Sequence, residues 1–450
     1  MINSNYNAPI SNSEPTIKVY GYRWIIIAIF ASFNAINFFQ FLQFTVIGDI
    51  IQTYYGIDET LTQMSGVVFM LAFILLFIPV GYIVENTSLK TSSMIGAGLT
   101  AVGNCLKLLA ISPGNFYWVI ISQSFCAVAQ VFMLITPSKI ASVWFGAEEV
   151  STACAIGLFG TQIGLALGAV VPALMVTNKD VQDGLTSLFI YNASISVILF
   201  IFVILFFRSK PQTPPSNSQA ELSSSNQDDR MTYWLATKGF LKNRDYLIVL
   251  STIGIGYGIW TSFGILVNQI FTKAFPDDHG TDLGILTCIT CISGGCFGTM
   301  FFGYILDKTH KFKLVAFTVL LANTLAGIIQ AAFFIKSYKP GVMIIVPING
   351  FFSGSLMVIG FEYAIETTYP TPEAFGAAIL NTVIYVFGIL YVLFYNIVVD
   401  NISYAAGQII FVASLALATF GTIFISPELR RRNANLKFEV NEGFTKDTVE

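Results

Sequence analysis

The sequence predicts an all-α integral membrane protein whose twelve transmembrane helices form two six-helix halves. Its 450 residues are 54% hydrophobic and only 11% charged, whereas soluble domains carry roughly 25% charged residues. Twelve apolar stretches approach or exceed the length of about 20 residues that crosses a bilayer. A polar segment divides these stretches into six and six. The net charge of -3 provides no basic surface for nucleic acid, so none is expected as a partner.

The predicted spans follow one another with short loops inside each half. In the first half they cover Trp24–Ile47, Met64–Val84, Thr91–Ile111, Tyr117–Ile135, Val150–Met175 and Leu188–Phe207. In the second half they cover Tyr246–Phe271, Leu283–Ile305, Leu314–Ile335, Val342–Ile365, Ala374–Val398 and Ile402–Ile425. The predicted organisation is an N-terminal tail (1–22), a first half (23–207), a linker (208–244), a second half (245–425) and a C-terminal tail (426–450).

A short motif recurs in the two halves. Gly81-Tyr-Ile-Val-Glu85 ends the second span and Gly303-Tyr-Ile-Leu-Asp307 ends the eighth, an offset of 222 residues (303 minus 81). The repetition indicates an internal duplication, a plan common among membrane transporters. Small residues permit close helix contact, and each motif ends on an acid. We therefore predict that Gly81, Glu85, Gly303 and Asp307 belong to a gate on the cytoplasmic side.

Basic residues predict the orientation in the membrane. With both termini on one side, that side receives 18 Lys and Arg residues and the opposite side receives 4, while Lys107 lies within the third span. Cytoplasmic loops carry an excess of Lys and Arg. Both tails and the linker are therefore expected in the cytoplasm.

Polar and aromatic side chains within the spans are candidates for a central site, because polar groups in lipid should face a cavity or a neighbouring helix. Several of them recur at helical spacing on one face of their span. These candidates are Asn34, Asn37, Phe41 and Thr45 on the first span, Gln162 on the fifth, Tyr257, Trp260, Thr261, Gly264 and Asn268 on the seventh, Glu362 and Glu366 on the tenth, and Asn381 and Tyr385 on the eleventh. Rings, amides and one acid suit an organic cation, which is attracted to aromatic faces.

Catalysis and metal binding are not indicated. The two histidines, His279 and His310, fall in loops on opposite sides, and no Ser/His/Asp set or phosphate loop is present. Cys288 and Cys291 form a CxxC pair on an apolar helix without histidine or acidic neighbours, which favours a helix contact over a metal site. We therefore expect neither an enzyme nor a cofactor.

Longer strings resemble the feline leukaemia virus subgroup C receptor family of major facilitator transporters. The resemblance runs from about Tyr22 to Arg432. The strings that carry it are Asn37–Phe44, Ala129–Phe132, Pro137–Gly146, Glu149–Ala155, Asn268-Gln269, Gly360–Ala364 with Glu366, Thr368–Pro370 and Phe387–Ile389.

The resemblance implies a choline and ethanolamine transporter with a major facilitator fold. It also implies roles for individual residues. A first-helix tryptophan of the family is Phe41 here, a seventh-helix tyrosine is Thr261 beside Trp260 and near Tyr257, and an eleventh-helix glutamine is Tyr385. The family's Gln162, Asn37, Gln40 and Glu362 are retained.

Two other functions stay open at this point. Family members were earlier described as haem carriers, and a non-transporting membrane receptor is the third possibility. A haem site would favour cavity Arg or Lys and an axial His, but the predicted spans contain one Lys, no Arg and no His. A loop site for haem at His279 or His310 is left open. We expect a monomer in the plasma membrane, with the mitochondrial or endoplasmic reticulum membrane as alternatives.

Overall fold

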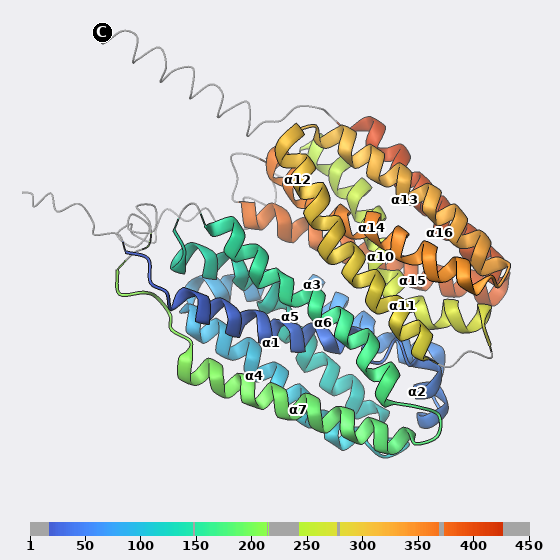
Figure 1. The fold of residues 1–450 in the computed structure, drawn as a ribbon, viewed down its shortest axis with the longest axis horizontal. Coiled ribbons are helices and arrows are strands. Elements are labelled where there is room, and N and C mark those ends of the chain that lie inside the picture. The colour runs from blue at the N-terminus through green and yellow to red at the C-terminus, as the bar shows by residue number, and fades with distance from the viewer. Residues whose placement is uncertain are drawn as a thin grey trace, which may run out of the picture.

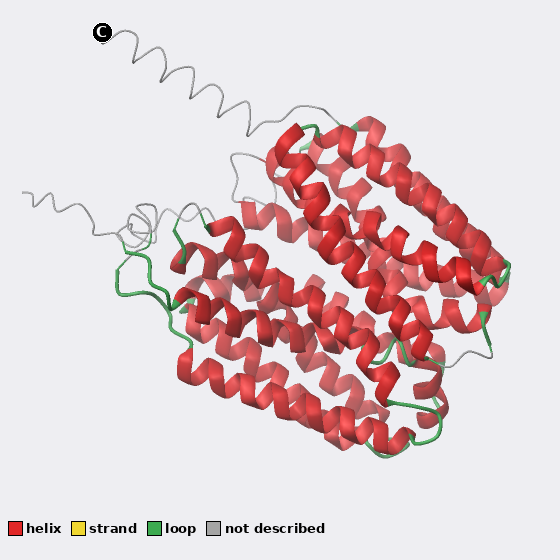
Figure 2. Ribbon diagram, in the orientation of Figure 1, coloured by secondary structure: helices red, strands yellow, loops and turns green. Residues whose placement is uncertain are grey.

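The computed structural model describes residues 18–146, 149–213, 215, 243–276, 280–368 and 373–425. Every regular element in these ranges is helical (Figure 2). Twelve helical segments are long and apolar enough to cross a membrane, which confirms the predicted spans. The C-terminal tail, His279, and most of the N-terminal tail and of the linker lie outside the described residues.

The helices form two bundles that lie side by side (Figure 1). The first half contains α1 (Arg23–Leu42), α2 (Gly48–Tyr55), α3 (Glu59–Asn86), α4 (Leu89–Leu106), η1 (Lys107–Ala110), α5 (Phe116–Trp144), α6 (Val150–Met175) and α7 (Val181–Phe206). The second half contains α10 (Arg244–Ala274), α11 (Thr281–Ile292), η3 (Ser293–Gly298), α12 (Thr299–Thr309), α13 (Phe312–Ile335), α14 (Lys339–Thr368), α15 (Glu373–Asn401), α16 (Tyr404–Gly421) and η4 (Thr422–Phe424).

Two spans depart from the continuous helices that hydropathy predicts. The first ends as an α-helix at Leu42 instead of Ile47, and the short helix α2 follows after a turn. The eighth consists of α11 and α12 joined by the π-helical turn η3, whose sequence Ser-Gly-Gly-Cys-Phe-Gly contains three glycines. Hydropathy depends on composition alone and is blind to both interruptions. Turns of this π type are frequent at functional sites.

Glycines bring α6 directly against α1. A side chain at Gly160, Gly164 or Gly168 would collide with the backbone carbonyls of Ala31, Ala35 and Phe39. These glycines recur every four residues, so they form one stripe along α6. Close packing of small residues is a main source of helix association in lipid, and it makes α1 a central helix of its bundle.

A matching pair of lysines supports the duplication. Lys90, at the start of α4, donates to the carbonyl of Ile204 in the last turn of α7 (2.7 Å). Lys313, at the start of α13, donates to the carbonyl of Ile423 in η4 (2.9 Å). The two lysines lie 223 residues apart (313 minus 90), which agrees with the offset of the glycine motifs. In each half, therefore, the third transmembrane helix caps the sixth with a cation, where the helix dipole favours positive charge.

The described contacts between the halves lie in the middle of the bundle and at the end that carries α2, here called the α2 end. At that end a side chain at Gly284 of α11 would press on Ala173 of α6. Toward the opposite end, where α1 begins, here called the tail end, α12 lies farther from α6 (Figure 1). The two halves are thus joined at the α2 end and spread at the tail end.

Candidate functional site

Aromatic rings from both halves meet near the middle of the bundle. The ring of Tyr385 (α15) stands edge-on to Phe73 (α3) at 5.3 Å between centroids. Phe41 (α1) stands edge-on to Phe69, one turn earlier on α3, at 5.6 Å. Helix α3 therefore contacts Phe41 of the first half through Phe69 and Tyr385 of the second half through Phe73. The sequence reasoning identified Phe41 and Tyr385 but missed both phenylalanines of α3.

The three predicted residues of α10 lie near its midpoint and are half-buried. The Trp260 ring stacks on Phe263 (5.8 Å, 9° between planes) and rests against Gly350 of α14, where a side chain would come within 3.1 Å of it. The Tyr257 hydroxyl lies 3.5 Å from the Met357 sulfur. The Thr261 hydroxyl donates to the carbonyl of Gly258 within its own helix (2.8 Å).

Gln162 lies at the midpoint of α6 and reaches the other half. Its side chain lies against Gly295, where no side chain could be accommodated. Gly295 belongs to the π-helical turn η3. The turn and its glycine thus make room for an amide of the first half inside the second.

Asn37 and Gln40 do not lie with these residues. Both are fully buried inside the first half. The Asn37 amide donates to the Thr100 hydroxyl (3.0 Å) and to the Cys126 carbonyl (2.9 Å), so it faces α4 and α5. Gln40 accepts a hydrogen bond from the buried amine of Lys107 (2.5 Å). A central helix has neighbours on every side, so a shared helical stripe does not identify a cavity face.

Glu362 also lies apart from the ring cluster. Its side chain is exposed, and it lies five residues beyond Met357, the contact of Tyr257, which is about 7.5 Å along α14 at 1.5 Å per residue. The placement of this carboxylate in the central site therefore stays a prediction. Hydropathy placed it a turn inside the span, but α14 continues to Thr368 and carries it toward the tail end.

The two glycine motifs lie at the tail end, in α3 and α12. A side chain at Gly81 or at Gly303 would meet no atom within 4 Å. Neither glycine makes the close helix contact that the sequence suggested. The side chains of Glu85 and Asp307 lie outside the described residues.

Amides join the two halves at the α2 end. The side chain of Asn268 (α10) makes three hydrogen bonds to the first half. Its oxygen accepts one from the backbone N–H of Asp49 (3.0 Å). Its nitrogen donates one to the Asp49 carboxylate (2.9 Å) and one to the Val46 carbonyl (2.9 Å). Gln63 (α3) donates to Gln269 (3.2 Å) and accepts from Asn396 of α15 (2.6 Å). Asp49, Gln63 and Asn396 were missed, because single polar residues near helix ends give no sequence signal of pairing.

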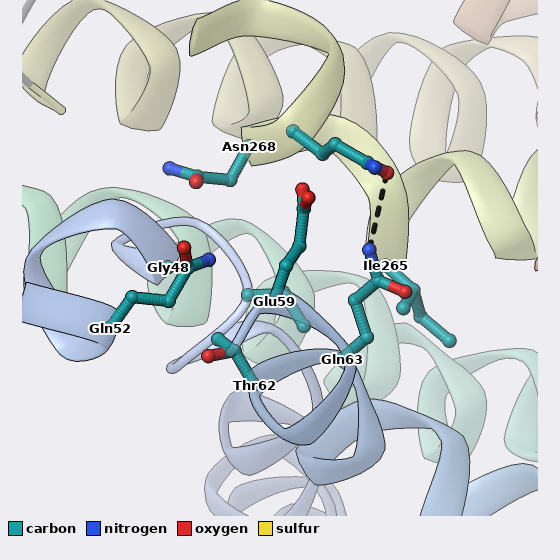
Figure 3. Close-up of a pocket in the computed structure, with 9 residues that line it drawn as sticks. Gly48, Gln52, Glu59, Thr62, Gln63, Ile265 and Asn268 are labelled. Atoms are coloured by element: carbon teal, nitrogen blue, oxygen red, sulfur yellow. Dashed lines mark hydrogen bonds between the residues drawn. The ribbon is translucent and has the colours of Figure 1, made fainter. Parts of the chain in front are cut away.

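A small polar cavity lies among these contacts (Figure 3). Its volume is about 10 Å³, and its lining includes Glu59, Thr62, Gln63, Asn268 and Gln269. This volume suits roughly one water molecule and is too small for an organic substrate. The cavity is a feature of the closed α2 end and not the central site.

Helix α2 is fixed to the first half by two tyrosines. The hydroxyls of Tyr54 and Tyr55 donate to the carbonyls of Ile111 and Ala110, each at 2.6 Å. Burial raises the pKa of both hydroxyls, so they remain protonated donors at neutral pH. Helix α2 therefore links the loop after η1 to Asn268 of the second half.

The described residues contain no group of three His, Cys, Asp or Glu side chains placed to hold a metal ion. His310 lies at the end of α12 with a left-handed backbone (φ 53°). The middle of the bundle instead presents rings and an amide from both halves. Such a site can bind a small molecule and change its surroundings when the halves move relative to each other.

Comparison with known proteins agrees with this architecture. The Major Facilitator Superfamily profile matches residues 24–392. A bacterial homologue of the human lysosomal transporter Spinster, solved in an inward-facing and unoccupied conformation, superposes with a TM-score of 0.69. It covers 92% of this chain and 99% of its own at 11% identity, and this likeness concerns the fold alone.

Two relatives are similar in sequence along nearly the whole chain. The choline/ethanolamine transporter FLVCR2 of Rattus norvegicus is 33% identical over 427 residues, covering 94% of this chain and 78% of its own. The choline/ethanolamine transporter flvcr2b of Danio rerio is 31% identical over 428 residues, covering 94% and 87%. The chain belongs to the major facilitator superfamily and, within it, to the feline leukaemia virus subgroup C receptor family.

Proposed function

We propose that this protein transports a small organic cation, choline or ethanolamine, by alternating access between its two halves. The observation that carries the proposal is the contact of Tyr385 with Phe73, together with that of Phe41 with Phe69. Rings from both halves share the middle of the bundle. The names of the sequence relatives support the same substrate class.

The proposed substrate site consists of residues near that middle layer: Phe41, Gln162, Tyr257, Trp260, Thr261 and Tyr385. An aromatic face attracts a desolvated cation by about 0.5–2 kcal/mol, and the Gln162 amide can orient a hydroxyl group. Asn37 and Gln40 support this site from inside the first half. Glu362 acts at the tail end, where it attracts a cation electrostatically.

The gate at the tail end is proposed to include Gly81, Glu85, Gly303 and Asp307. Open space around both glycines is what a separated gate requires, because the close contact forms only when the halves approach. At the α2 end, the bonds of Asn268 and Gln63 hold the halves together. With the tails in the cytoplasm, this conformation faces inward.

The proposal also covers the orientation of the protein in the membrane, its oligomeric state and the membrane that holds it. Both termini are proposed to be cytoplasmic, on the 18-to-4 distribution of basic residues, and the protein to act as a monomer among the lipids of the plasma membrane. It is proposed to carry out no chemical reaction. No contact of the described residues favours haem, since the buried Lys107 faces the interior of the first half.

The proposal is tested by uptake of radiolabelled choline into cells that lack their own choline uptake. We expect saturable uptake that unlabelled ethanolamine inhibits. A protein that reaches the surface and moves haem, with choline uptake equal to that of untransfected cells, would overturn the proposal. Antibody binding to a C-terminal tag on intact cells would overturn the proposed orientation.

A further inference from the structure

Lys107 carries a buried positive charge that the proposed substrate site does not use. It is the first residue of η1, and its exposed fraction is 0%. Among the residues that the structure describes, it is the only charged side chain that is buried. Burying an ammonium is costly unless every N–H group is bonded, so this position calls for an explanation.

Three amide oxygens surround the amine. Lys107 Nζ donates to Gln40 Oε1 (2.5 Å), Gln123 Oε1 (3.3 Å) and Asn104 Oδ1 (3.4 Å). It also lies 5.2 Å from the centre of the Phe44 ring. An ammonium has three donors, and these three oxygens satisfy all of them. No carboxylate pairs with Lys107 among the described residues.

The three acceptors come from α1, α4 and α5 and converge on the last turn of α1. A helix leaves its last four carbonyls without helical partners, and α1 ends at Leu42. The freed carbonyl of Gln40 accepts from Gln123 Nε2 (2.8 Å). Lys107 and Gln123 thus hold both the side chain and the backbone of Gln40.

The turn held in this way leads into both functional regions of the first half. Phe41, the proposed substrate ring, is the next residue. Val46 and Asp49, which bond to Asn268 of the second half, follow within nine residues of Gln40. The position of one anchored turn therefore affects the substrate ring and the closed α2 end together.

We propose that Lys107 is a positioning residue that fixes the last turn of α1. In this way it sets the position of Phe41 toward the substrate and of Val46 and Asp49 toward Asn268. The effect on substrate binding rests on the proposed function. The anchoring of residues 43–47, the turn that follows α1, does not rest on it.

The second half shows that a polar cluster at this place does not need a charge. Between α13 and α14, its third and fourth transmembrane helices, Asn349 donates to Gln330 (2.8 Å) and Ser353 donates to Asn323 (3.0 Å). All of these groups are neutral. In the first half, the charged Lys107 bonds to the last turn of α1, which ends early at Leu42. In the second half, the equivalent helix α10 continues without interruption to Ala274.

The first experiment measures hydrogen exchange of the purified protein, without substrate, for the parent, Lys107→Met and Gln123→Glu. Gln123→Glu keeps the ammonium paired but removes the donor to the Gln40 carbonyl, so it tests the anchor even where Lys107→Met fails to fold. In both variants the hydrogen-exchange rate of the backbone N–H groups of residues 43–47 should rise roughly tenfold or more, because this turn loses the bonds that restrain it. Asn323→Ala and Lys179→Met serve as controls and should leave this segment unchanged.

The second experiment measures choline uptake kinetics of the same variants. KM should rise roughly threefold to tenfold while the maximal rate per surface molecule changes less than about twofold, the signature of weakened binding. Unchanged exchange at 43–47, or equal increases throughout α1, α4 and α5, would overturn the anchoring role. Faster hydrogen exchange at residues 43–47 together with an unchanged KM would overturn the claim that Lys107 positions Phe41 toward the substrate. A parent without choline flux would overturn the proposed function and leave the exchange result to decide the anchor.

Discussion

The two halves of this protein share their framework but differ in their interiors. Lys90 and Lys313 cap equivalent helix ends, so the bundle packing is preserved between the repeats. The first half contains the buried amine of Lys107 and a first helix that ends early, whereas the second half keeps a neutral cluster and an unbroken α10. The second half also supplies most of the proposed substrate rings. Duplication thus preserved the packing, while the surroundings of the site diverged between the halves.

The largest effect is expected from the rings of the second half. Trp260→Ala should raise KM for choline roughly tenfold to thirtyfold, since the loss of a strong cation–π contact is worth up to about 2 kcal/mol. Phe41→Ala should raise it less, about threefold to tenfold, and Phe41→Trp should leave KM equal or lower it. Uptake kinetics of the three variants at matched surface expression test this ranking. Parental KM values for both alanine variants would contradict the ring site.

The gate motifs should affect rate and not affinity. Glu85→Gln and Asp307→Asn should each lower the maximal uptake rate roughly fivefold, with KM within about twofold, because gate movements limit turnover in many such proteins. Initial uptake rates over a range of choline concentrations measure both quantities. An unchanged rate in both variants would remove these acids from the gate.

The α2 end should open when its principal bond is lost. Asn268→Ala removes three hydrogen bonds between the halves and should shift the population toward an outward-open state. A cysteine introduced at the buried Thr45 should then react severalfold faster with an impermeant maleimide added outside. Ser251→Ala, on the same helix, is a control without such bonds across the halves. Equal labelling of the Asn268→Ala variant and the parent would show that these amides do not hold the α2 end.

The smallest effect concerns the shared framework. Lys90→Met and Lys313→Met each remove one bond to a last-turn carbonyl, worth about 0.3–1 kcal/mol. Each should lower the unfolding midpoint of the purified protein by about 1–3 °C, and by similar amounts in the two halves. A clear drop for only one of them would show that the caps are not equivalent.

The sequence predicted the twelve spans and the two six-helix halves, whereas the residues of the substrate site stay a prediction. The hydrocarbon core of a membrane requires long apolar stretches, so hydropathy identified the spans. Helical spacing placed Tyr257, Trp260 and Thr261 on one face of the seventh span, and these residues lie near the midpoint of α10. The same spacing suggested a cavity face for Asn37, and the family resemblance suggested one for Gln40. Both side chains are buried inside the first half, because the glycines of α6 make α1 a central helix with polar neighbours on several sides. Composition also could not reveal the end of α1 at Leu42 or the π-helical turn at Gly295. At both interruptions a residue far away in the chain makes contact: Gln123 donates to the Gln40 carbonyl, and the Gln162 side chain lies against Gly295.

The central claim is that an organic cation crosses the membrane through a site shared by the two halves. The most direct test is flux of radiolabelled choline into proteoliposomes that contain only the purified protein, compared with the Trp260→Ala variant. The account predicts saturable flux that ethanolamine inhibits and that preloaded choline accelerates, with a KM about tenfold or more higher in the variant. Choline flux no greater than in protein-free liposomes, from protein that is folded and monodisperse, would contradict it.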